Sequence, residues 1–400
     1  MLYVTLSETR TPDSVRRCAV IAGKEVWWEI TGPSDALPLP LTVHDMAVTA
    51  FTNFAMHRGE DLHINGPVSE SMLESVEGLV ASWVNLRPDL YQRIKVTADT
   101  EIPDSALPVP PRHTAIVAFS GGLDASFTTW RHFTGRAGRR SRNLFAGVLV
   151  QGLDMPLCAD QAFANACGNA KQTLNSINRP LMAVKTNWRD EVCTEWVMEF
   201  GTAVTTCLRI WQGLVDTALV GSDEDYSRLV MPLGGNPLTF AMLSSSGFTV
   251  IYDGAEFART EKAGGISDWE MGMRNLRVCW QGPLTGYNCG ICEKCLRTKM
   301  NFLASGAPLP PALAGMPTIS QILGIRVRIN FQIVLLNEVY EIAMKNGIKA
   351  PWLNALRWTI AKNSLMNGLP SPLVHLWGVL KNSVISLFNT SKTTDAKSGH

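Results

Sequence analysis

The middle of the chain alternates short apolar runs with longer amphipathic stretches. Runs such as "TAIVAFS", "NLFAGVLVQ", "LMAVKTNW", "TALVGSD" and "FTVIYDG" are typical of buried strands, and the segments between them are long enough to be crossover helices. This order predicts an α/β fold with a doubly wound parallel sheet, in which ligands bind at the carboxyl ends of the strands. Functional residues are therefore expected directly after the apolar runs.

The two ends of the chain have other patterns. Residues 1–104 begin with strand-like runs and end with apolar residues at helical spacing, which predicts an N-terminal α+β module. Residues 318–390 are helical in period throughout, and the polar residues 391–400 predict a disordered tail. Proline-rich stretches at 103–112 and 305–317 predict linkers on either side of a middle domain over residues 113–304.

Composition and charge narrow the range of partners. The 400 residues include 36 Lys and Arg against 35 Asp and Glu, so no overall basic field favours nucleic acid, although a nucleic-acid partner is possible. The basic run "RAGRRSR" could meet an acidic partner or RNA, but such a run is more often a solvated loop. Neither a secretory signal nor an apolar run of membrane-spanning length is recognisable, which predicts a cytoplasmic protein without membrane contact.

The stretch "AFSGGLDASF" places two glycines between a predicted strand and a predicted helix. Gly121 and Gly122 let backbone N–H groups turn toward one point, and the helix start adds partial positive charge there. The lysine with which a Walker loop contacts the β and γ phosphates is missing. The loop is therefore expected to hold pyrophosphate while the reaction takes place at the α-phosphate. The expected ATP-binding residues are Ser120, Gly121, Gly122, Leu123, Asp124 and Ser126, with Asp124 as a candidate Mg²⁺ ligand or organiser of the loop. The alternative is a glycine turn without a ligand.

Four of the nine cysteines lie close together, at Cys279, Cys289, Cys292 and Cys295. The odd total and the lack of an export signal disfavour disulfides, whereas closely spaced thiolates can surround one tetrahedral ion. Soft sulfur ligands favour Zn²⁺, and a four-cysteine zinc site is typically structural. An iron–sulfur cluster is the rival interpretation, followed by free thiols.

The glycine loop resembles the Ser-Gly-Gly-x-Asp-Ser loop of the N-type ATP pyrophosphatases, in the adenine nucleotide alpha hydrolase superfamily. It departs from that pattern at Ala125, which stands where the family has serine and is followed by Ser126. Together with the four cysteines, residues 113–304 resemble the QueC family of 7-cyano-7-deazaguanine synthases. "LVGSDEDY" and "TEKAGG" are similar to substrate-pocket elements of that family, which implies catalytic roles for Asp225 and Lys262 beside Asp124. For the acidic residues 223–225, a solvated loop is an equal alternative.

The resemblance implies a reaction. QueC enzymes use ATP to adenylate the carboxylate of 7-carboxy-7-deazaguanine, add ammonia and dehydrate the amide to a nitrile, and they carry a four-cysteine zinc. Here the family's Tyr-Pro-Asp-Cys-Arg element is missing, Arg297 lies one residue closer to the last cysteine, and both ends are extended. These features are more similar to the QueC-like enzymes of anti-phage cassettes, first those of the Qat system and then those of type IV CBASS.

That closer resemblance implies a different acceptor. The activated deazaguanine carboxylate would be joined to an amine on a partner protein from the same gene cassette, and the expected cofactors are ATP, Mg²⁺ and Zn²⁺. Three alternatives stay open: a biosynthetic synthase that uses ammonia, a tRNA-modifying adenylating enzyme, and a non-catalytic nucleotide-binding scaffold. Ala125 is the sequence feature that favours the scaffold.

Overall fold

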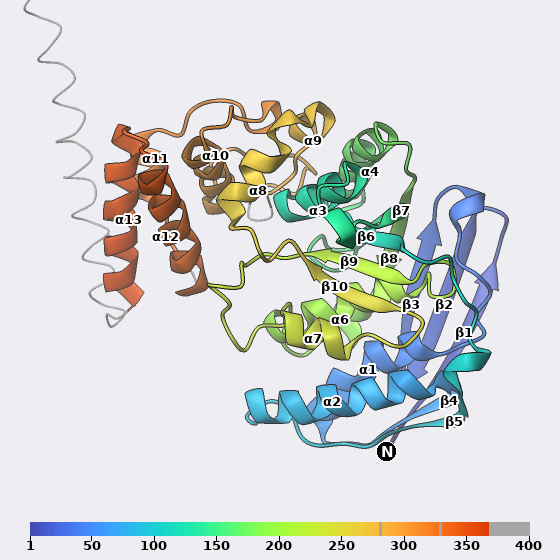
Figure 1. Ribbon diagram of the computed structural model, residues 1–400. Helices are drawn as coiled ribbons and strands as arrows, with labels where there is room; N and C mark the ends of the chain where they lie inside the picture. Colours follow the sequence, from blue (N-terminus) through green and yellow to red (C-terminus); the bar gives the residue numbers. More distant parts are fainter. Residues whose placement is uncertain (280–281, 328–329, 368–400) are drawn as a thin grey trace, which may run out of the picture.

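A single mixed sheet runs through the molecule (Figure 1). The computed structural model describes residues 1–279, 282–327 and 330–367. Within them, ten strands lie in the order β10-β9-β6-β7-β8-β3-β2-β1-β4-β5. The strands are β1 (Leu2–Arg10), β2 (Ser14–Ile21), β3 (Lys24–Thr31), β4 (Leu62–Ser69), β5 (Val96–Ile102), β6 (Thr114–Ala118), β7 (Asn143–Gln151), β8 (Leu181–Thr186), β9 (Thr217–Gly221) and β10 (Thr249–Asp253).

Helices cover both faces of this sheet. They are α1 (Asp45–Arg58), α2 (Glu70–Leu86), α3 (Leu123–Phe133), α4 (Asp160–Asn175), α5 (Trp188–Glu191), α6 (Trp196–Arg209), α7 (Pro237–Met242), α8 (Arg259–Gly265), α9 (Glu270–Arg274), α10 (Glu293–Ser305), α11 (Ile319–Gly324), α12 (Asn330–Lys345) and α13 (Pro351–Asn367). In Figure 1, α3, α4 and α8 lie above the sheet, and α1, α2, α6 and α7 lie below it.

The five strands from β6 to β10 form the parallel part of the sheet. Strand β6 pairs in parallel with both β7 and β9, so the chain order reverses between β6 and β9. Its first four residues are buried, which is typical of a parallel strand covered on both faces. The prediction of an α/β fold with a parallel core is thus confirmed, and the carboxyl ends of β6 and β9 adjoin at the position where such folds bind ligands.

The N-terminal part extends the same sheet instead of forming a second one. Strands β1, β2 and β3 are antiparallel neighbours, and β3 pairs antiparallel with β8, with Trp28 opposite Thr186. Beneath the sheet, α1 packs against α6 and α2 packs against α7. Residues 1–102 are therefore joined to the middle part through both the sheet and the helices.

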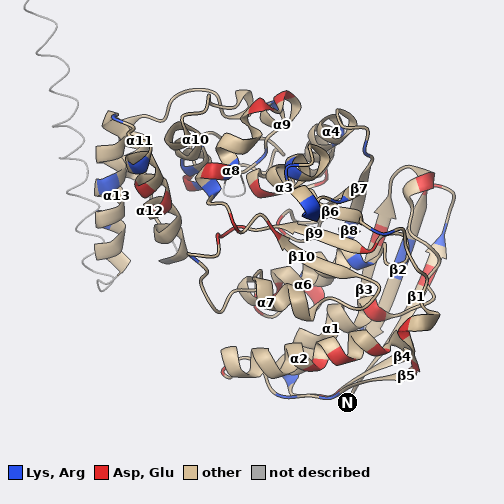
Figure 2. Cartoon of the chain, in the orientation of Figure 1, with Lys and Arg blue, Asp and Glu red and all other residues tan. Residues whose placement is uncertain are grey.

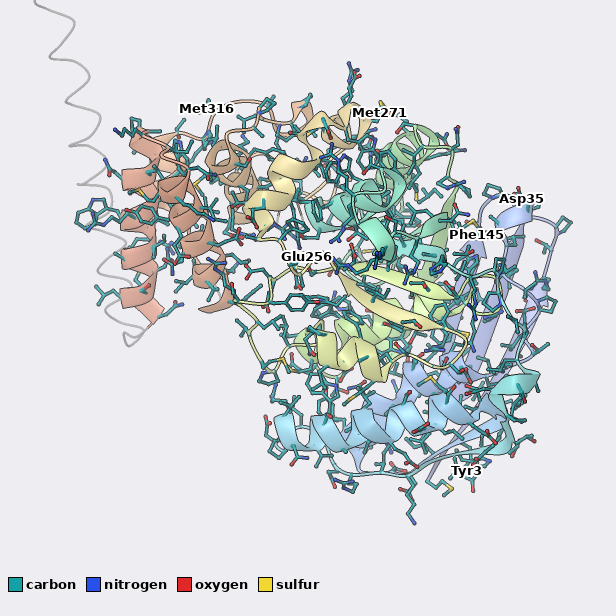
Figure 3. The ribbon with its side chains drawn as sticks, viewed as in Figure 1. Tyr3, Asp35, Phe145, Glu256, Met271 and Met316 are labelled. Atoms are coloured by element: carbon teal, nitrogen blue, oxygen red, sulfur yellow. The ribbon has the colours of Figure 1, made fainter. Side chains whose placement is uncertain are left out.

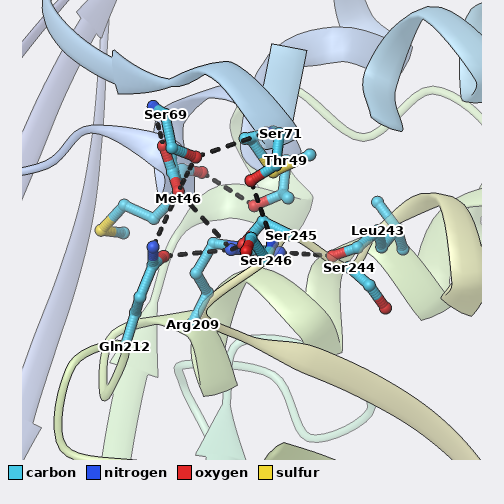
Figure 4. A network of polar contacts seen from close by, with 12 residues as sticks. Met46, Thr49, Ser69, Ser71, Arg209, Gln212, Leu243, Ser244, Ser245 and Ser246 are labelled. Carbon is cyan, nitrogen blue, oxygen red and sulfur yellow. Dashed lines mark hydrogen bonds and ion pairs between the residues drawn. The ribbon is translucent and has the colours of Figure 1, made fainter. Parts of the chain in front are cut away.

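A buried polar network adds to this joint (Figure 4). Gln212 donates from Nε2 to Asp45 Oδ2 at 2.8 Å, and Arg209 Nη1 lies 3.8 Å from the same oxygen. Arg209 also donates to Ser245 Oγ at 3.0 Å, while Ser69 Oγ donates to Asp45 at 2.7 Å. Because Asp45 and Arg209 are each almost fully buried, their charges compensate each other where α1 meets α6.

The helical C-terminal region is confirmed as far as Asn367. Helices α10 to α13 enclose a small core of their own that includes Met300, Ile322, Leu336 and Leu356. The predicted tail at 391–400 and the end of the predicted helical region, from 368 to 390, lie outside the described residues. Among the described helices, none combines the length and the apolar character that a membrane crossing requires.

Candidate functional site

The glycine loop forms the turn between β6 and α3. Gly121 has φ +74°, a left-handed conformation that favours glycine, and Gly122 caps the start of α3. The Gly122 N–H points back to Ser120 Oγ at 3.2 Å. At the end of β9, a Cβ on Gly221 would lie 2.7 Å from the carbonyl carbon of Asp124. The end of β9 therefore presses directly against the first turn of α3.

A cavity of about 300 Å³ opens over this turn, at the carboxyl ends of β6, β7 and β9. Its volume reaches the lower end of the range of small-molecule sites, about 300–1,000 Å³. Large apolar side chains from α6, α7 and β10 line one part of it, namely Trp196, Phe200, Val204, Phe240 and Tyr252. Cationic side chains line another part, namely Arg259 at the start of α8, Arg277, and Lys294 in α10.

The expected ATP-binding residues fall into two groups. Ser120, Gly122 and Asp124 line the cavity, whereas the side chains of Leu123 and Ser126 are almost fully buried and lie outside its lining. Ala125 lines the cavity in place of the serine of the resembled family. Gly121 does not line the cavity, and its carbonyl accepts from the Arg277 N–H at 2.7 Å.

Asp124 is paired with cations of α8. Arg259 Nη1 donates to Asp124 Oδ2 at 2.6 Å, and Lys262 Nζ lies 3.7 Å from Oδ1, which accepts no hydrogen bond. Burial by itself raises the pKa of Asp124, but the charges of Arg259 and Lys262 outweigh it and hold that pKa below its usual range. The Asp124 carboxylate therefore orients Arg259. Because it is already paired with two cations, it is poorly suited to be a Mg²⁺ ligand.

Lys262 lies behind the cavity wall. Its ammonium donates to the Ser222 carbonyl and, at 2.6 Å, to Ser222 Oγ. Burial lowers the pKa of Lys262, and the Asp124 carboxylate counteracts this effect. Because the side chain is 1% exposed and absent from the lining, Lys262 ties α8 to the end of β9, and Arg259 is the α8 cation that reaches the cavity.

The acidic residues 223–225 are folded into a loop and are largely buried. Asp225 accepts from Arg228 Nη1 at 2.9 Å and from the Ser227 N–H at 2.9 Å, and it lies outside the cavity lining. Asp223 does line the cavity and accepts from the Tyr252 hydroxyl at 2.9 Å. The structure therefore brings Asp223, and not Asp225, together with the glycine loop.

Glu224 is turned away from solvent within the same loop. Its Oε2 accepts from the Val230 N–H at 2.8 Å, while its Oε1 is buried without a hydrogen-bond partner. Burial raises the pKa of Glu224 to about 7. A solvated loop, the alternative interpretation of this stretch, does not fit a side chain that is 3% exposed.

The four cysteines converge as their spacing predicts. Their sulfur atoms all lie within 4.8 Å of one another, with Sγ–Sγ distances of 3.4 Å for Cys279–Cys289, 3.7 Å for Cys279–Cys292 and 3.9 Å for Cys289–Cys295. Four sulfurs around one Zn²⁺ at about 2.3 Å stand about 3.8 Å apart, so these thiols fit a tetrahedral zinc ion. The interaction with Cys295 lowers the pKa of the Cys292 thiol to about 5, and the same interaction raises the pKa of Cys295, so Cys292 is the member of this pair that is favoured as a thiolate.

Asn288 fixes the two halves of this cluster relative to each other. Its Oδ1 accepts from the N–H groups of Val278 and Cys279 at 2.9 and 3.2 Å, and its Nδ2 donates to the Leu276 carbonyl at 2.7 Å. A Cβ at position 282 would lie 2.9 Å from Cys279 Sγ, so Gly282 allows the chain to pass close to the sulfurs. Asn288 gives no sequence signal of its own, unlike the cysteines.

Two of the four arginines in the basic run at 136–142 pair with acidic residues of the chain. Arg136 pairs with Asp268 at 3.2 Å, and Arg140 pairs with Glu256, which also accepts from Arg131 at 2.7 Å. Glu256, labelled in Figure 3, lies between β10 and α8. In the described part of the chain, Figure 2 shows basic and acidic residues interspersed over the fold. These pairings agree with the interpretation of the run as a surface loop.

Several lining residues carried no recognisable sequence motif. Arg259, Arg277 and Lys294 come from three separate segments, and a single chain gives no sign that they converge. The nearest signal is the position of Lys294 between two predicted metal ligands. No family model matches the sequence, and searches of the curated proteins and of the solved structures found no match.

Proposed function

We propose that this chain is an ATP-dependent ligase that adenylates the carboxylate of a 7-deazaguanine and passes the acyl group to an amine. One observation carries the proposal: the cavity at the switch point of the sheet combines a glycine loop, three cationic side chains and an aromatic wall. Small-molecule sites in open α/β sheets lie at this position.

The glycine loop and the cations suit a triphosphate. Backbone N–H groups at the start of α3 and the charges of Arg259, Arg277 and Lys294 can neutralise a pyrophosphate leaving group. A carboxylate resists attack by an amine, and transfer of AMP gives it a good leaving group. Catalysis then consists largely of holding the carboxylate against the α-phosphate while the pyrophosphate is stabilised.

The aromatic wall suits a planar heterocycle. Phe200 and the stacked pair Phe240 and Tyr252 line this part of the cavity, and the Asp223 carboxylate offers acceptor oxygens to the N–H edge of a guanine-like ring. Within residues 1–279, 282–327 and 330–367, the four cysteines form the sole group of three or more potential metal ligands. Mg²⁺ would therefore enter with the nucleotide, held chiefly by its phosphates, and Zn²⁺ would occupy the cysteine cluster.

The acceptor amine follows from the resemblance to anti-phage enzymes, which points to a partner protein from the same gene cassette. Purified protein is incubated with ATP, Mg²⁺ and 7-carboxy-7-deazaguanine, with ammonia, tRNA or the neighbouring-gene protein added in separate reactions. The proposal expects AMP and pyrophosphate whose formation depends on the deazapurine, and a conjugate on the partner protein. Release of ADP, or AMP formation that depends on tRNA alone, would contradict it.

A pair of variants connects this activity to the cavity. Arg277→Met removes a lining cation. The control Arg274→Met, three residues earlier in the chain, removes an exposed arginine that pairs with Glu270 at 2.8 Å. We expect Arg277→Met to lose AMP formation by at least tenfold, the size of one charge-assisted hydrogen bond. Arg274→Met should keep the activity of the unmodified protein, and equal losses in both variants would count against the assigned cavity.

A further inference from the structure

The segment that carries the four cysteines also forms a wall of the cavity. We call its described residues, 277–279 and 282–295, the metal loop. Cavity-lining residues occur on both sides of the ligand Cys279 and again between the ligands Cys292 and Cys295. A zinc ion that only stabilises the fold need not lie near a ligand site, whereas this cysteine cluster borders the cavity directly.

The first end of the metal loop is hydrogen-bonded to the glycine loop. The Arg277 N–H donates to the Gly121 carbonyl at 2.7 Å, and Arg277 Nε donates to the Ser120 carbonyl at 3.3 Å. Arg277 is two residues before Cys279, whose own N–H is held by Asn288. The position of this arginine against the glycine loop thus depends on the segment that the cysteine cluster fixes.

The second end of the metal loop brings Lys294 to the same cavity. Cys292 caps α10, and Lys294 lies in its first turn, next to the ligand Cys295. The Lys294 ammonium has no hydrogen-bond or ion-pair partner among the described residues, although it lines a cavity that Arg259 and Arg277 also line. Three carboxylates, Asp124, Asp154 and Asp223, line the same cavity. Asp124 bonds Arg259, and Asp223 accepts from Tyr252. The charge of Asp154 acts on both Lys294 and Arg277, but among the described residues it forms no hydrogen bond or ion pair with either.

From this arrangement we infer that Lys294 binds a phosphate group of the nucleotide, and that the four-cysteine metal site holds Lys294 and Arg277 in position to do so. The proposed function already places the charge of Lys294 near the pyrophosphate. The inference rests on that nucleotide site and adds a direct phosphate contact whose position depends on the metal site. An anion in the cavity would give the Lys294 ammonium a partner at hydrogen-bond distance. The expected ligand class is a nucleoside triphosphate or its pyrophosphate.

The test compares Lys294→Met and Lys294→Gln with Lys294→Arg, and with Lys171→Met, which changes an exposed lysine of α4 outside the cavity lining. Affinities of the zinc-loaded proteins for ATP, inorganic pyrophosphate and adenosine are measured by calorimetry, and zinc content is measured by atomic absorption. We expect Lys294→Met and Lys294→Gln to keep four-cysteine zinc binding and to bind ATP and pyrophosphate about tenfold or more weakly. Adenosine affinity should not change, and Lys294→Arg should retain most of the phosphate affinity.

The second arm measures the coupling to the metal. Because binding free energies are reciprocal, ATP should reduce the fraction of zinc that the unmodified protein loses to a chelator at equilibrium, and this protection should shrink in Lys294→Met. Unchanged ATP affinity in Lys294→Met, an equal loss of adenosine affinity, or zinc loss that ignores ATP would overturn the inference alone. If the unmodified protein bound neither ATP nor pyrophosphate, the proposed function would fail together with it.

Discussion

Asp124→Asn tests the charge arrangement behind the cavity most sharply. In the structure the Asp124 carboxylate lies 2.6 Å from Arg259 Nη1 and 3.7 Å from Lys262 Nζ, and these cations are 4% and 1% exposed. Asparagine has nearly the same shape but leaves both cations without their nearest negative charge. Removal of one partner from a buried ion pair typically costs about 3–5 kcal/mol of folding free energy. Since Asp124 itself is 17% exposed, we expect the lower half of that range.

The assay is urea denaturation of Asp124→Asn and of a control, Glu270→Gln, which breaks an ion pair on the surface. Folding lowers the pKa of Asp124, so its contribution is fully present at neutral pH and is lost as acid protonates the carboxylate. The difference between the unmodified protein and Asp124→Asn should therefore shrink below about pH 4. Inorganic pyrophosphate should stabilise Asp124→Asn more than the unmodified protein, because it returns negative charge to Arg259. A variant as stable as Glu270→Gln would refute this reasoning.

Three further changes probe the neighbouring elements. Gly221→Ala should cost about 1–3 kcal/mol in urea denaturation and weaken ATP binding, because its Cβ would meet the Asp124 backbone at 2.7 Å. The control Gly168→Ala, with open space around it, should not. Burial raises the pKa of Glu224 to about 7, so the unmodified protein should lose stability as the pH rises from about 4.5 to about 7. Glu224→Gln should not show this loss. The variant should be more stable than the unmodified protein by at most about 3 kcal/mol at pH 8, with no difference near pH 4. Cys292→Ser should lose zinc and melt at a lower temperature, and retention of full zinc content would contradict the four-sulfur site.

The parts of this fold that sequence predicts well are local. Strand, glycine turn and helix follow one another within about twenty residues, and Gly121 favours the positive φ that it adopts. The cysteine spacing is likewise short enough for the four sulfurs to meet around one ion. The sequence also distinguishes the helical C-terminal region from the α/β part before it, because its apolar residues recur at helical spacing.

The parts that sequence does not predict depend on distant pairings. Strand β3 joins β8 across more than 150 residues, so no local pattern indicates that the strands of the N-terminal α+β part extend the central sheet. Asp223 accepts from Tyr252 of the distant strand β10, whereas Asp225 is held by Arg228 within its own loop. A loop with three successive acidic residues carries no local signal for which of them faces inward.

A crystal structure with α,β-methylene ATP and Mg²⁺ tests the central claim most directly, because this analogue cannot be cleaved between its α and β phosphates. The account predicts its phosphates at the N–H groups of the glycine loop, within reach of Arg259, Arg277 and Lys294, with the α-phosphate open toward Asp223 and the aromatic wall. A nucleotide bound elsewhere, or one in this cavity with its γ-phosphate pointing at the aromatic wall, would contradict it.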